Sequence, residues 1–156
     1  MVAWCAVSCA FAQTTASETH SPEPLQVASQ PATATESHQL AQRFLDEKVA
    51  VWRQRLKLES WQISATMARR SDLPPKTLGG IRWDKNKKNA VIWVLDPSEY
   101  RLPFEEALKD LELTIVHEMV HLDLASLPRG QASRTSEEHA VDGIAQALLE
   151  LDRKKE

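Results

Sequence analysis

The chain has 156 residues and a formal net charge of −3, with 42% hydrophobic and 26% charged residues. These values are ordinary for a single globular domain, and we expect a monomer. The mildly acidic balance gives no electrostatic reason to expect a nucleic-acid partner. No apolar run reaches the roughly 20 residues that a membrane-spanning helix needs, so we also expect no membrane span.

The first 37 residues of the chain do not have the composition of a folded domain. Residues 1–12 are apolar and end in Ala10-Phe11-Ala12, which resembles a signal-peptidase site, but they are short and lack the basic start of a secretory signal. We favour a truncated-looking signal and export to the periplasm or the medium; the alternative is a chance apolar tail on a cytoplasmic protein. Residues 13–37, rich in Ser, Thr, Ala and Pro, predict a disordered linker. The folded domain is then residues 38–156.

Apolar spacing predicts a helix followed by three strands in the first half of this domain. Large apolar residues recur at three- and four-residue intervals over 40–56, which is typical of an amphipathic helix. Alternation over 61–67 predicts a half-buried strand. A hairpin follows, formed by 81–83 and 90–95 around a polar turn. Since 90–95 is apolar on both faces, we expect an inner strand; the alternative is an edge strand covered by substrate.

Two helices complete the domain, which makes it α+β. One is predicted from about Phe104 to the breakers Pro128 and Gly130. Its inward positions are Leu108, Leu111, Ile115, Met119 and Leu122. The last helix is predicted from about Ser136, and its inward positions are Val141, Ile144, Ala145, Leu148 and Leu149.

The clearest chemical signal is His117-Glu118-Met-Val-His121 within the first of these two helices. Residues four apart project from the same helix face, so both imidazoles can hold one ion. Glu118 lies beside that face and can accept a proton from water without being a ligand. Both cysteines lie in the first nine residues, so a zinc ion in the folded domain must be held by imidazole and carboxylate.

A catalytic zinc ion needs three protein ligands and one open position. Leu124 and Leu127 stand where a metzincin would have a glycine and a third histidine, so that branch is excluded. The acidic start of the last helix, Glu137-Glu138-His139-Ala-Val-Asp142, is the nearest source of a third ligand. Asp123, just after the motif, departs from the usual apolar residue and is assigned to the rim.

Together these motifs resemble the gluzincin branch of the zincin metallopeptidases. The match over 138–149 is closest to minimal members, the minigluzincins and ImmA-like peptidases, and the order of elements agrees over roughly 60–150. The resemblance implies a minimal zincin-like fold. It also implies Glu138 as the third ligand and Asp142 as the carboxylate that orients the imidazole of His117.

Other assignments remain open for the last helix. Thr135 to Glu138 also forms a capping box, so Glu138 could simply cap the helix. His139 is an alternative third ligand, because SprT-like zincins use a later histidine, and Glu137 is another. Asp142 could be a solvated surface acid.

The sequence therefore predicts a peptidase with one catalytic Zn²⁺, acting on a peptide or protein substrate. The alternative is a non-catalytic zinc-binding module with a regulatory or protein-binding role. Tyr100 and Arg101 lie in the loop before the active helix; we treat them as surface groups rather than oxyanion donors. The neighbouring sheet is expected to bind substrate as an added strand.

Overall fold

The computed structural model describes residues 34–127 and 134–154. The predicted signal segment, the linker up to residue 33, and the breakers Pro128 and Gly130 lie outside these ranges. The first helix begins at Ala34, so the last four residues of the predicted linker are helical. In the part of the chain that is described, no helix is long and apolar enough to cross a membrane.

The predicted α+β fold is confirmed, with three helices and a three-stranded mixed sheet among the described residues. Two short 3-10 turns, η1 and η2, precede β2 and α2. In chain order the elements are α1 (Ala34–Arg55), β1 (Gln62–Ala68), η1 (Arg70–Asp72), β2 (Gly79–Asp84), β3 (Asn89–Leu95), η2 (Pro97–Glu99), α2 (Phe104–Leu124) and α3 (Arg134–Arg153).

The sheet has the order β1-β3-β2, so β3 is the central strand, as its apolar run predicted. The alternative, an edge strand covered by substrate, is wrong. β2 and β3 form the expected antiparallel hairpin, with Ile81 opposite Ile92. β1 pairs with β3 in parallel, which places Ala65 beside the same Ile92. β1 and β2 are therefore the two edges.

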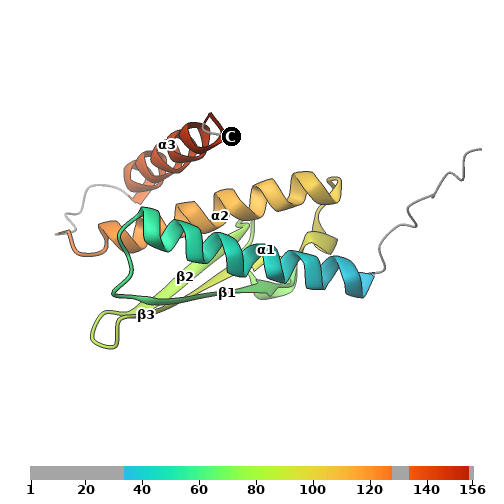
Figure 1. The fold of residues 1–156 in the computed structure, drawn as a ribbon, viewed down its shortest axis with the longest axis horizontal. Helices are drawn as coiled ribbons and strands as arrows, with labels where there is room; N and C mark the ends of the chain where they lie inside the picture. Colours follow the sequence, from blue (N-terminus) through green and yellow to red (C-terminus); the bar gives the residue numbers. More distant parts are fainter. Residues whose placement is uncertain (1–33, 128–133, 155–156) are drawn as a thin grey trace, which may run out of the picture. The chain divides into compact units, whose positions relative to one another are not determined.

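Helices α1 and α2 pack against each other and on the sheet, α1 on β1 and α2 on β2 and β3 (Figure 1). Leu111, Ile115 and Met119 of α2 are fully buried, so its predicted inward stripe lies in the core. Trp52 of α1 donates its indole N–H to Oε1 of Glu112 at 2.9 Å. Core packing and this buried hydrogen bond therefore fix α2 against α1 and the sheet.

Helix α3 packs on α2 through a narrow stripe. Val141, Ala145 and Leu149 are buried there, at successive positions four residues apart. Leu148 is half-buried, but Ile144 is 42% exposed, and its predicted inward position is wrong. A helix resting on one neighbour covers only the residues close to the contact line, and Ile144 is turned about 60° away from Val141.

Candidate metal centre

Three side chains from α2 and α3 converge on one point. His117 and His121 are one turn apart on α2, and their Nε2 atoms lie 3.1 Å from each other. Glu138, from the first turns of α3, places Oε2 at 3.3 Å from Nε2 of His121 and 3.4 Å from Nε2 of His117. Within the described residues, these three form a group that could hold a metal ion.

The spacing of these three atoms fits zinc. A tetrahedral zinc ion lies about 2.0–2.1 Å from imidazole nitrogens and about 2.0–2.2 Å from a carboxylate oxygen, so its ligand atoms are about 3.3–3.5 Å apart. The observed separations of 3.1, 3.3 and 3.4 Å match that triangle closely. Two imidazoles and one carboxylate are also a ligand set that zinc accepts, and all three residues line the same cleft.

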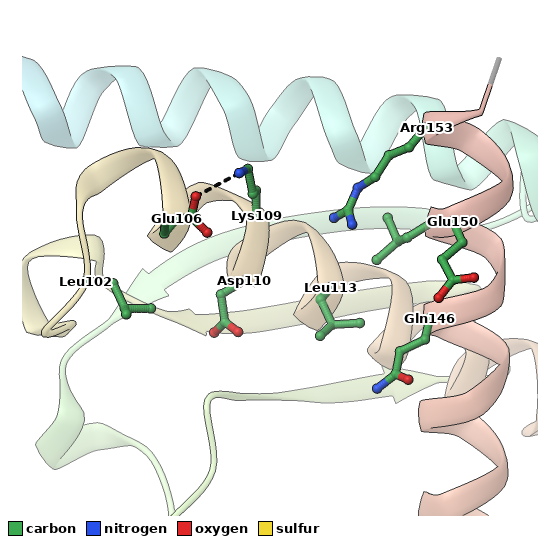
Figure 2. A pocket seen from close by; sticks show the side chains of 9 residues that line it. Leu102, Glu106, Lys109, Asp110, Leu113, Gln146, Glu150 and Arg153 are labelled. Atoms are coloured by element: carbon green, nitrogen blue, oxygen red, sulfur yellow. Dashed lines mark hydrogen bonds and ion pairs between the residues drawn. The ribbon is translucent and has the colours of Figure 1, made fainter. Parts of the chain in front are cut away.

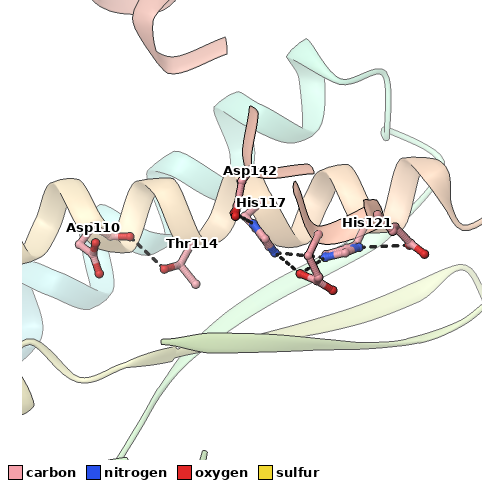
Figure 3. Close-up of polar contacts among 7 residues, drawn as sticks. Asp110, Thr114, His117, His121 and Asp142 are labelled. Atoms are coloured by element: carbon pink, nitrogen blue, oxygen red, sulfur yellow. Dashed lines mark hydrogen bonds and ion pairs between the residues drawn. The ribbon is translucent and has the colours of Figure 1, made fainter. Parts of the chain in front are cut away.

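The other ring nitrogen of each histidine faces a further carboxylate of α3. Nδ1 of His117 lies 2.9 Å from Oδ1 of Asp142 (Figure 3). Nδ1 of His121 lies 3.5 Å from Oε1 of Glu137, which is an ion-pair distance longer than a hydrogen bond. A carboxylate on Nδ1 keeps the proton there and leaves Nε2 free to bind a cation.

Glu118 lies beside this cluster at the wall of the cleft and is only 8% exposed. The pKa of Glu118 is raised to about 7, mainly by burial; the charge of His117 lowers it and that of nearby Glu138 raises it. A carboxyl group that titrates near neutral pH can both take and return a proton.

The cluster opens into a cleft of about 490 Å³. One wall is the approach to the edge strand β2, residues 76–79. The other is the face of α2 that carries the two histidines, together with Glu138 and Asp142 from α3. Gly79 makes the close approach of β2 to α2 possible, since a Cβ atom there would lie 2.4 Å from Cγ2 of Thr114.

The residues predicted from the sequence do not all lie in the cluster. His139 is exposed on α3 and does not belong to the metal-binding group. Glu137 faces Nδ1 of His121 instead of the shared centre. Helix α3 begins at Arg134, so Thr135 lies inside the first turn rather than at the N-cap position that a capping box requires.

Two site features were missed. Tyr100, treated as a surface group, has a buried hydroxyl. Asp110, which no motif includes, lines the cleft two turns before His117 on the same helix face. The seven-residue spacing from Asp110 to His117 was the one available signal, because residues seven apart share a helix face.

The three ligand atoms are arranged as a group that could hold a metal ion, and a protonatable carboxyl group lies beside them, within a cleft bordered by a strand edge. In comparisons with protein families, curated proteins and solved structures, nothing matches this chain.

Proposed function

We propose that this protein is a zinc-dependent peptidase. The observation that carries the proposal is the triangle of His117 Nε2, His121 Nε2 and Glu138 Oε2, with sides of 3.1 to 3.4 Å, next to the buried carboxyl group of Glu118. The spacing supports a tetrahedral ion with one open position, and Glu118 supplies the base that peptide hydrolysis requires.

Each residue of the cluster has a distinct role in this proposal. His117, His121 and Glu138 would hold the ion, and Asp142 would keep the proton of His117 on Nδ1. Zinc in this position would polarise the peptide carbonyl and lower the pKa of a water molecule. Glu118 takes the proton from the attacking water and returns it to the leaving amine.

The substrate in this proposal is an extended peptide added to the free edge of β2. This edge is supported because residues 77–79 line the same cleft as the histidines, whereas the other edge strand, β1, does not. Main-chain hydrogen bonds to an edge strand hold a peptide extended, with alternate side chains facing the helix.

The second hypothesis is a zinc-binding module that regulates or binds another protein without cleaving it. The buried Glu118 disfavours this hypothesis. Burying a carboxyl group costs free energy, and a module that only binds zinc does not need a carboxyl group that is not a ligand.

Cleavage of casein and of a peptide mixture by the zinc-loaded protein tests the proposal. We expect Glu118→Gln to keep its zinc and lose cleavage by about 10²- to 10⁴-fold, as expected for loss of a general base. Glu105→Gln is the matched control, since it removes one charge from an exposed position of the same helix. A Glu118→Gln variant as active as the wild type contradicts the assigned base. Bound zinc with no cleavage by the wild type favours the binding module.

A further inference from the structure

Four carboxylates line the cleft, and the proposed reaction uses three of them. Glu118 is the base, Glu138 holds the ion, and Asp142 contacts His117. The fourth, Asp110, has no part in metal binding or in proton transfer.

Asp110 also forms no ion pair with any of the described residues; the lysine beside it in the chain, Lys109, pairs with Glu106. Its Oδ2 atom and the hydroxyl of Tyr100 are both buried. The two groups are neighbours: burial and the adjoining Asp110 carboxylate raise the pKa of Tyr100 above its usual range, and the charge of Arg70 opposes this shift. Lys76 lines the same cleft, but in the described parts of the chain it forms no ion pair with Asp110. A carboxylate in a cleft that is paired with no cation of the described residues can accept a charge-assisted hydrogen bond from a cationic ligand.

Asp110 lies on the same helix as the two histidines, so helix geometry sets its distance from the metal cluster. Asp110, Thr114 and His117 follow one another along one face of α2 (Figure 3). Seven residues of helix separate Asp110 from His117 by about 10.5 Å along the axis. An extended peptide advances about 3.3 Å per residue, so this distance spans about three peptide residues.

The cleft does not end at Asp110. Asp110 and Leu113 also line a second groove of about 390 Å³ between α2 and α3, whose other lining residues include Gln146, Glu150 and the basic Lys109 and Arg153 (Figure 2). The two hollows share Asp110 and Leu113, so a peptide that reaches Asp110 from the metal cluster has a further groove beside it.

We propose that the cleft selects peptides with a positive charge about three residues from the cleaved bond, and that Asp110 binds this charge. The charge is an Arg or Lys side chain, or the free α-amino group of a short peptide. The hydroxyl of Tyr100, which lies next to the carboxylate, is placed to donate to it. This inference rests on the proposed peptidase function, because it names the substrate class of the same site.

Binding to the zinc-loaded Glu118→Gln variant tests the inference without requiring cleavage. The probes are acetylated and amidated octapeptides of one neutral sequence, carrying a single Arg or a single citrulline at each position in turn, measured by calorimetry. Citrulline has nearly the shape of arginine and no charge. A second arm compares the free and acetylated N-termini of the neutral peptide, which separates a side chain from an α-amino group as the source of charge.

We expect the best Arg peptide to bind at least about tenfold more tightly than its citrulline counterpart, the effect of one charge-assisted hydrogen bond. Adding Asp110→Asn should reduce this preference to below about twofold, whereas adding Glu105→Gln should leave it intact. Cleavage by the wild-type protein should fall about three residues from the charge, as located by mass spectrometry.

Equal binding of every Arg and citrulline pair, and of the free and acetylated peptides, overturns the inference, and this comparison requires no change at Asp110. A preference that survives Asp110→Asn overturns the assignment to that residue. Failure of the peptidase proposal looks different: the wild type then cleaves nothing, although the charge preference in binding can persist. Cleavage of charged and neutral peptides at equal rates leaves the peptidase in place and removes the charge selection.

Discussion

Replacing Gly79 with alanine is expected to destabilise the protein by about 3 kcal/mol, because β2 approaches α2 most closely at this residue. A Cβ atom at Gly79 would lie 2.4 Å from Cγ2 of Thr114 and 2.5 Å from the carbonyl oxygen of Trp93. Carbon atoms pack favourably at about 3.5–4.0 Å, so the first contact overlaps by about 1 Å. The second involves the backbone of the central strand, which cannot rotate away.

Gly80→Ala is the matched control. It changes the next residue of the same strand in the same way, but a Cβ atom there meets nothing within 4 Å. Neither glycine has a positive φ, so alanine brings no backbone strain at either position. We expect Gly80→Ala to leave stability unchanged or to raise it by about 0.5 kcal/mol, because alanine reduces the entropy of the unfolded chain.

Urea unfolding followed by tryptophan fluorescence measures both variants. The midpoint should fall for Gly79→Ala with an unchanged m-value. Thr114→Ser in the Gly79→Ala background should recover part of the loss, since it removes the methyl group and keeps the hydroxyl. The reasoning is refuted if Gly79→Ala and Gly80→Ala agree within about 0.5 kcal/mol.

Three further changes test other parts of the structure. Glu112→Leu should lower the free energy of unfolding by about 1–3 kcal/mol in urea, because it leaves the buried indole N–H of Trp52 without an acceptor; unchanged stability contradicts this. Asp142→Ala should weaken zinc binding by about 10- to 100-fold in a chelator competition, and an unchanged affinity removes its orienting role. Asp96 is pulled two ways: burial raises its pKa, but hydrogen bonds, including one with His38, lower it overall from the usual 3.8. The wild type should therefore lose stability relative to Asp96→Asn as the pH falls below about 3.8, and parallel pH profiles contradict this.

The fold could be predicted where local pattern decides the structure. The run at 90–95 is apolar on both faces, and only a central strand buries both, so β3 was placed correctly. The parallel pairing of β1 with β3 was not predicted. This pairing joins strands that are far apart in the chain: between Ala65 and its partner Ile92 lie a 3-10 turn and the strand β2. The alternation of apolar residues shows only which face of a strand is buried, and it does not show which strand lies beside it.

For the site too, local helix geometry could be predicted from the sequence and the packing between helices could not. The shared face of His117 and His121 follows from helix geometry alone. Which acid of the next helix meets them depends on how α3 packs on α2, and the apolar periodicity of α3 did not determine that packing. The error at Ile144 has the same origin, since it assumed a wider contact between the two helices.

The pairing of Asp110 with Tyr100 could not be recognised from the sequence, because Tyr100 comes from the loop before α2. Only the path of that loop, through η2 and into the helix, brings the hydroxyl beside the carboxylate. Loop conformation leaves no periodic signal in the sequence. The assignments of zinc, of the third ligand and of peptidase activity stay predictions that require measurement.

Zinc content tests the central claim most directly. The purified protein, metal-stripped and reloaded in stoichiometric zinc, should hold one zinc ion per chain with nitrogen and oxygen ligands and no sulfur in X-ray absorption. His117→Ala and Glu138→Ala should each weaken that binding, while Glu105→Gln should not. A wild-type chain that retains no zinc, or a Glu138→Ala variant that binds it as tightly as the wild type, contradicts the proposed centre.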